Sequence, residues 1–168
     1  SIADLPPAQY YLAGARMIVN FKDRLLFIGC VVQTSAVGSQ RYLQDTIIYS
    51  QNGTPYYTAS FTAGVNYPLP LVTTPPGYVP ILVPDDQTAT PSAFFEDSTG
   101  FGGFLTAGIS QPMITSSINK DVIIVGLETI QSKVVYTGND IIPFNIYLIN
   151  SELGSSSTFS AINTDKGV

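Results

Sequence analysis

The sequence predicts an all-β protein built from antiparallel hairpins, and three features support that prediction. The 168 residues are 45% hydrophobic and only 11% charged, with ten Tyr, nine Phe and no Trp, a composition that favours strands over disorder. Short β-branched or apolar runs alternate with tight turns, as in hairpins. No stretch combines helical periodicity with capping residues. Propeller blades, a sandwich or a barrel are the architectures that such a chain favours.

The first strands are expected on either side of a two-residue polar turn. Lys22-Asp23 separates a strand at 16–21 from an apolar strand at 24–33. A further strand is expected at 41–50, where a β-branched run ends at an Asn-Gly turn. We expect the segment after that turn, 56–62, to be its hairpin partner.

The same pattern recurs later in the chain. Each copy has a Lys-Asp pair, an apolar run closed by Gly, a β-branched pair followed by Tyr, a polar turn, and Pro with an aromatic ring. A recurring unit is typical of repeat folds, so the repeat favours partial β-propeller blades over a sandwich or a barrel. The second copy predicts strands at 113–118, 122–128, 132–137 and 144–150, and the two copies together predict burial of Leu26, Ile28, Ile123 and Val125.

Between the two copies lies a long proline-rich insertion. The predicted organisation is a first blade-like unit over 1–63, an acidic proline-rich loop or arm over 64–112, and a second blade-like unit over 113–168. Because proline removes a ladder donor, central strands are excluded from the insertion, apart from short pieces such as 79–83. The glycine-rich stretch 100–104 is predicted to be a flexible β-turn. Seven of the twelve prolines fall between residues 68 and 91, at Pro68, Pro70, Pro75, Pro76, Pro80, Pro84 and Pro91.

The charge distribution argues against a surface that grips nucleic acid. The net charge is −5, and no Lys or Arg occurs between Tyr42 and Asn119. The insertion is therefore purely acidic, and its carboxylates repel a phosphate backbone. We expect the arm to project toward a subunit contact or a central passage, with eight interface or conduit candidates: Asp85, Asp86, Phe94, Phe95, Glu96, Asp97, Phe101 and Phe104.

Most hydrolytic and metal chemistry is excluded by composition. The chain has no His and a single Cys, which rules out a Ser-His-Asp triad, a Cys-His pair, histidine-based zinc sites and a thiolate cluster. The sequence thus predicts a protein that is not an enzyme and that needs no cofactor or metal. Cys30, inside an apolar run, is expected to pack as a small apolar residue.

The acidic pairs leave two alternatives open. Asp85-Asp86 or Glu96-Asp97 could ligate Ca²⁺ through hard oxygen ligands, but neither has the spacing of a calcium loop. Paired acids can also cleave glycosides, and the phenylalanines of the insertion could stack on sugars. Solvated loop charge and an arm anchored on a neighbouring subunit are the simpler interpretations. No run approaches the length of a membrane span, and the final stretch 163–168 is similar to the start of another strand, which predicts a fragment of a longer protein.

Two stretches resemble a known family. Arg24-Leu25-Leu26-Phe27, followed by the run Ile47 to Gly53, resembles the propeller-bearing tail proteins of short-tailed bacteriophages. These are the nozzle proteins, also called tail tubular protein B or packaged-DNA stabilisation protein. The stretch 122–150 is similar to a neighbouring blade of that family, and 149–154 is similar to the linker onto the next blade. The resemblance covers roughly two thirds of the chain and excludes the proline-rich insertion.

The resemblance implies a structural virion protein of a phage tail. Such a protein self-associates into a ring, the nozzle, that retains and conducts the genome, contacts other tail proteins and lets DNA pass without tight binding. It is assembled in the host cytoplasm and resides in the virion tail. The alternative function is a β-rich carbohydrate-binding or carbohydrate-cleaving module, which requires two carboxylates in one aromatic-walled cleft.

Overall fold

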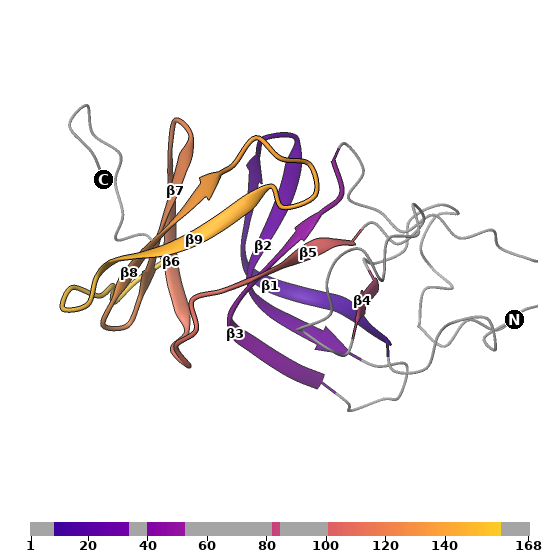
Figure 1. Ribbon diagram of the computed structural model, residues 1–168. Helices are drawn as coiled ribbons and strands as arrows, with labels where there is room; N and C mark the ends of the chain where they lie inside the picture. The colour runs from indigo at the N-terminus through magenta and orange to yellow at the C-terminus, as the bar shows by residue number, and fades with distance from the viewer. Residues whose placement is uncertain (1–8, 34–39, 53–81, 85–100, 159–168) are drawn as a thin grey trace, which may run out of the picture.

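The computed structural model describes residues 9–33, 40–52, 82–84 and 101–158, which form two antiparallel sheets without any helix (Figure 1). The first sheet has five strands in the order β4-β1-β2-β3-β5, and the second has four in the order β6-β7-β8-β9. Their bounds are β1 Gln9–Phe21, β2 Arg24–Gln33, β3 Gln40–Ser50, β4 Leu82–Pro84, β5 Phe101–Thr106, β6 Met113–Asn119, β7 Val122–Leu127, β8 Gln131–Tyr136 and β9 Phe144–Asn150. The expected all-β class is confirmed, and the described strands close no barrel.

Apart from the short β4, the two sheets have the same topology. Strands β1, β2, β3 and β5 follow one another across the first sheet in chain order, and β6 to β9 do so across the second. The strands predicted for the second unit agree with β6 to β9 to within a residue at each end. Each sheet is thus a four-stranded meander that begins with a hairpin about a Lys-Asp pair.

The two Lys-Asp turns are alike in sequence but differ in backbone conformation. Phe21 pairs with Arg24 across the first turn, whose Lys22 and Asp23 both have positive φ, at 53° and 59°. A type I′ turn has this pattern, and its twist suits a two-residue hairpin. In the second hairpin only Lys120 of the pair has positive φ, at 54°. Asp23 therefore bears the steric cost of a left-handed backbone conformation, whereas its counterpart Asp121 does not.

We expect Asp23→Gly to stabilise the protein by about 0.5–1 kcal/mol, because glycine removes the steric cost of a left-handed residue in a type I′ turn. The midpoint of urea unfolding measures the change. Asp121→Gly is the matched control, and it should lower stability because Asp121 has no positive φ to relieve and loses its ion pair with Lys22. A gain from both substitutions, or from neither, would show that backbone strain does not distinguish the two turns.

The insertion differs from its prediction in the part that the structure describes. Two of its stretches, β4 and β5, join the first sheet, whereas the sequence predicted a loop or arm with only short strand pieces such as 79–83. Both are edge strands. Pro84 of β4 pairs with Gln9 at the outer edge of the sheet, where no further described strand needs the N–H that proline lacks. β5 also occupies the position beside β3 that the hairpin expectation assigned to 56–62, a segment outside the described residues.

The glycine-rich stretch expected to be a flexible turn is part of β5. The reason is that the two glycines of this stretch lie very close to Tyr49 and Ser50, the last two residues of β3. A side chain at Gly102 would collide with the Ser50 carbonyl oxygen, and one at Gly103 with the Tyr49 ring. The register between β3 and β5 also shifts between Tyr49 and Ser50. The two glycines therefore let an edge strand pair beside a large aromatic side chain.

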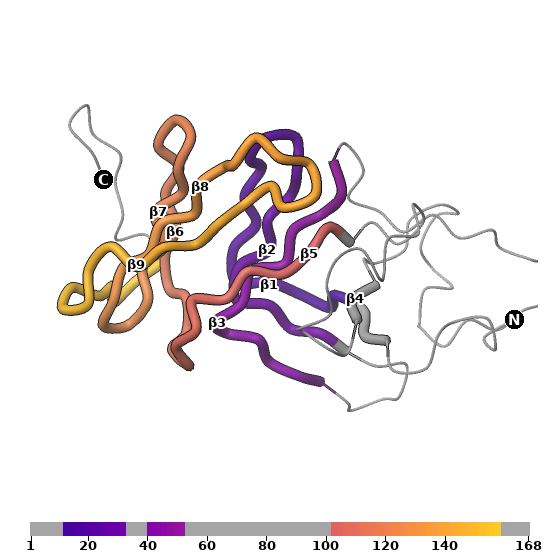
Figure 2. Tube along the Cα trace, viewed as in Figure 1, coloured from indigo at the N-terminus to yellow at the C-terminus, as the bar shows by residue number. Residues whose placement is uncertain are grey.

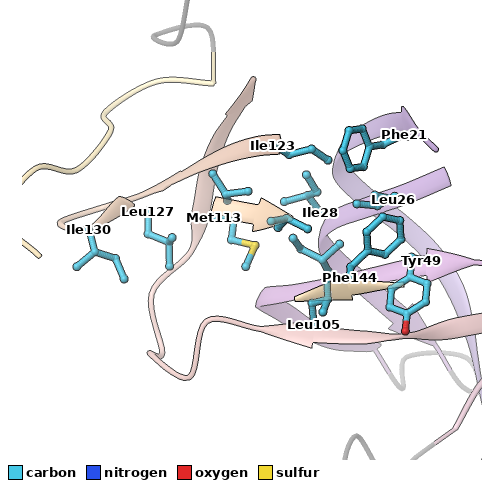
Figure 3. Packing of buried hydrophobic residues seen from close by; sticks show 13 residues of the cluster. Phe21, Leu26, Ile28, Tyr49, Leu105, Met113, Ile123, Leu127, Ile130 and Phe144 are labelled. Carbon is cyan, nitrogen blue, oxygen red and sulfur yellow. The ribbon is translucent and has the colours of Figure 1, made fainter. Parts of the chain in front are cut away.

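The main core lies between the two sheets, which pack face to face (Figure 3). Leu26, Ile28, Ile123 and Val125 all have 0% exposure, as the sequence predicts. The other buried members come from both sheets as well: Phe21, Ile47, Tyr49, Leu105, Met113, Leu127, Ile130, Val134 and Phe144.

Equivalent strands of the two sheets contribute opposite faces to this core. Leu26 and Ile28 are the third and fifth residues after the first Lys-Asp pair, whereas Ile123 and Val125 are the second and fourth after the second pair. Successive residues of a strand point to opposite faces, so one residue of offset exchanges the faces. The two sheets therefore stack front to back, as successive sheets in a row would, and not with equivalent faces turned toward each other.

A second, smaller cluster is formed within the first sheet. Its buried members are Cys30, Val32, Leu43 and Ile48, with Phe27 and Phe104 packed against them. The long strands β1, β2 and β3 bend near their middle (Figure 2), where Gly29 has a φ of 66° and the register between β2 and β3 shifts. Phe27, Ile48 and Phe104 alternate with residues of the main core along their strands, so this cluster lies on the opposite face of the first sheet.

Candidate functional site

Phe144, the first residue of β9, is 1% exposed and lies in the seam between the two sheets. Its ring lies 5.2 Å from the Tyr49 ring in an edge-to-face arrangement at 80°. The Phe21 and Tyr136 rings lie at 5.9 Å, tilted by 31° and 55°. The four rings come from β1, β3, β8 and β9, so this aromatic cluster joins both sheets. Figure 3 shows three of them, Phe21, Tyr49 and Phe144. Such tilted and edge-to-face pairs add to the stabilisation from burial alone.

The two Lys-Asp turns meet directly at one end of the seam. The Lys22 ammonium forms an ion pair with the Asp121 carboxylate, and it also lies 5.6 Å from the centre of the Tyr136 ring. The hydrogen bond from Lys22, and next its charge, lower the pKa of Asp121. Because this carboxylate side chain is 73% exposed, solvent screens the pair. The pair therefore contributes little to the stability of the fold, and its main effect is to position one Lys-Asp turn beside the other.

Arg24 is a buried cation in the same seam. It is only 7% exposed, and its Nη1 donates a hydrogen bond of 2.9 Å to the Ser50 carbonyl oxygen. Its Nη2 donates one of 3.3 Å to the Asp140 carbonyl oxygen, in the loop between β8 and β9. The guanidinium therefore links the end of β3 to the second sheet. Sequence reasoning missed this role, because nothing in the local pattern distinguishes a buried Arg at the start of a strand from a solvated one.

Arg24 also affects the ionisation of Tyr49. The guanidinium carbon lies 6.0 Å from the centre of the Tyr49 ring. Burial raises the pKa of Tyr49, and the nearby positive charge of Arg24 offsets part of that increase. Tyr49 thus reports on the seam, although it is not poised for proton transfer near neutral pH.

Strand β9 and its two flanking turns carry most of the exposed apolar side chains of the described residues. We call this surface the β9 rim, and it consists of Ile141, Ile142, Tyr147, Leu148, Ile149 and Leu153, each exposed by 49% to 65%. No charged residue interrupts the sequence between Asp140 and Glu152. In the described part of the chain, β9 is the edge of its sheet. β9 itself contains no charged residue and no proline, and an exposed apolar edge strand of this kind is typical of an interaction surface.

Most residues selected from the sequence as interface candidates lie outside the described residues, namely Asp85, Asp86, Phe94, Phe95, Glu96 and Asp97. Phe101 and Phe104 lie in β5. The half-buried Phe104 side chain packs against the cluster that contains Ile48, within its own sheet. An interface role for these eight residues stays a prediction.

Within the described ranges, no three His, Cys, Asp or Glu side chains lie together as a metal site would require. Cys30 is buried as expected, and burial raises the pKa of its thiol to about 12, which leaves it protonated and unreactive at neutral pH. Among these residues there is also no helix of the length and apolar character that crossing a membrane requires.

Neither a protein-family model nor a curated protein sequence matches the chain.

Proposed function

We propose that the chain is a structural part of a phage tail: two successive β-propeller blades of a nozzle protein, which assembles into a ring that retains and conducts the genome. The observation that carries the proposal is the row-like stacking of two equivalent four-stranded meanders. Propeller blades are four-stranded sheets repeated about an axis, and each packs one face on its predecessor and the other on its successor. The proposal is also supported by the resemblance to nozzle proteins, which covers 24–27, 47–53 and 122–150.

Self-association is the part of the proposal that concerns partners. The β9 rim offers apolar contact area, and Leu148 is 56% exposed on it. The chain's net charge of −5 disfavours tight contact with DNA, which suits a wall past which a genome slides. Under this proposal the protein performs no catalysis and binds no cofactor. It resides in the virion tail beside other tail proteins.

We expect the purified chain to form closed rings in negative-stain electron microscopy, with a matching mass in sedimentation. Leu148→Asp should shift the population to monomers, because it puts an unpaired charge into an apolar contact. Asn145→Asp, also exposed on β9, is the matched control and should leave the rings intact.

Binding to a panel of polysaccharides is measured in parallel. A chain that stays monomeric at every concentration would overturn the ring proposal, and specific glycan binding by that monomer would favour the carbohydrate module.

A further inference from the structure

The backbone of β9 has a definite orientation at the edge of the second sheet, where no described strand pairs with its outer side (Figure 1). The Thr137 amide donates a hydrogen bond of 2.8 Å to the Pro143 carbonyl oxygen, directly beside the pair formed by Tyr136 and Phe144. Opposed residues of an antiparallel ladder alternate between hydrogen-bonded and non-hydrogen-bonded pairs. This bond therefore fixes the direction of the backbone groups along β9.

Alternate residues of β9 direct their backbone groups away from β8. Asn145 and Tyr147 direct their N–H and C=O groups toward β8, whereas Phe144, Ile146 and Leu148 direct theirs outward. The first sheet covers the beginning of this edge, because β5 contacts β9 and Phe144 is only 1% exposed. The open part of the edge therefore begins at Ile146.

An antiparallel copy of the same strand, centred on Tyr147, matches this open edge. In that register Ile146 lies opposite Leu148 of the second copy, and the outward backbone groups of the two residues meet as a hydrogen-bonded pair. The two Tyr147 side chains lie opposite each other as a non-hydrogen-bonded pair, the kind with the closer side chains. Leu148 and Tyr147, which are 56% and 49% exposed, each gain an apolar counterpart.

The same pairing brings together the apolar turns at the two ends of β9. Ile141 and Ile142 precede the strand and are 65% and 56% exposed, and Leu153 follows it and is 60% exposed. In an antiparallel pair the end of one strand lies beside the beginning of the other, so Leu153 of the second copy comes to the end that carries the two isoleucines. β9 contains no charged residue, so no like charges oppose each other within the paired strands. The β9 rim thus matches a second copy of itself.

We propose that two copies of the chain pair through β9 in antiparallel orientation, with Tyr147 at the twofold axis, and so join their four-stranded sheets into one continuous sheet. Ile146 and Leu148 of each copy exchange main-chain hydrogen bonds with Leu148 and Ile146 of the other. The inference rests on the self-association of the proposed function, and it gives the β9 rim a defined partner and register. Because the contact is twofold symmetric, a ring that uses it holds an even number of copies.

Disulfide trapping in the 168-residue chain tests the register. Under mild oxidation Tyr147→Cys should give a disulfide-linked dimer on a non-reducing gel, because the Cβ atoms of such a pair lie about 4.5 Å apart, within disulfide reach. Asn145→Cys, on the same face of β9, is the matched control and should stay monomeric, since its two copies are offset along the strands by about 13 Å. The buried Cys30 thiol does not compete in either variant.

Absence of a linked dimer from Tyr147→Cys would overturn the inference. Equal yields from Tyr147→Cys and Asn145→Cys would do so too, because random collisions of exposed thiols have no register.

A second pair of variants tests the main-chain hydrogen bonds without a new thiol. Leu148→Pro removes an N–H group that points outward, so the ladder between β8 and β9 stays intact. In sedimentation its dimer dissociation constant should be at least about tenfold higher than that of Leu148→Val, which keeps the N–H. Equal dissociation constants would contradict strand pairing.

The strand pairing and the ring fail in different ways. Linked Tyr147→Cys dimers without rings in electron microscopy would leave the pairing in place and overturn the ring. Rings from a chain whose Tyr147→Cys variant forms no disulfide would leave the ring in place and overturn the pairing.

Discussion

Replacing Phe144 by Ala is expected to lower the free energy of unfolding by about 3–5 kcal/mol, the largest effect among the substitutions considered, because it removes a fully buried ring from a packed core. Phe144 is 1% exposed and contacts rings from both sheets, including Tyr49 at 5.2 Å between ring centres. The substitution leaves a cavity at the point where the sheets meet. Urea unfolding followed by circular dichroism measures the loss.

Tyr147→Ala is the matched control for this prediction. Tyr147 lies in the same strand, three residues further on, but it is 49% exposed and points away from the seam. Its loss should cost no more than about 1 kcal/mol. Equal losses from the two substitutions would mean that the aromatic cluster does not hold the sheets together. A Phe144→Leu variant should fall between them, since leucine keeps the burial but not the ring contacts.

The strands were predictable because their signals are local. Two-residue turns at Lys22-Asp23 and Lys120-Asp121 fix the register of the hairpins that they connect, and the alternation of apolar residues sets the buried face. Burial of Leu26, Ile28, Ile123 and Val125 followed from the same pattern. The repeat predicted two equivalent units, and each sheet contains a four-stranded meander in chain order, although the first sheet takes β5 from the stretch assigned to the insertion.

The position of β5 was not predictable from its own residues. Phe101 to Phe104 contains two adjacent glycines, which favour a turn when they are considered alone. They lie in a strand that pairs with β3, so close to Tyr49 and Ser50 that a side chain at either glycine would collide with one of them. The partner is about fifty residues away in sequence, at a distance where local patterns give no information.

The seam's electrostatics also lay beyond sequence reasoning. The Lys-Asp pairs were identified as turn residues, but the contact between Lys22 and Asp121 depends on how the two sheets stack. The charged residues predicted to be functional were carboxylates, whereas the buried charge in the described seam is the guanidinium of Arg24. Its acceptors are backbone carbonyl groups, which no sequence pattern marks.

We expect Arg24→Ala to lower the free energy of unfolding by about 2–4 kcal/mol. The substitution removes the buried aliphatic part of the side chain and leaves the Ser50 and Asp140 carbonyl oxygens without their donor. Arg24→Met should restore the packing but not the hydrogen bonds, and so recover about half of the loss. Lys133→Ala, at an exposed position of β8, is the control and should change stability by less than about 0.5 kcal/mol.

A spectroscopic titration separates the charge of Arg24 from its packing. The positive charge of Arg24 favours the ionised form of Tyr49, so its removal should raise the pKa of that tyrosine further above its ordinary value. Absorbance of tyrosinate in Arg24→Met, compared with Tyr49→Phe to identify the signal, measures the shift. An unchanged Tyr49 titration, or an Arg24→Ala variant as stable as the parent, would show that the cost of burying this cation cancels what its contacts contribute.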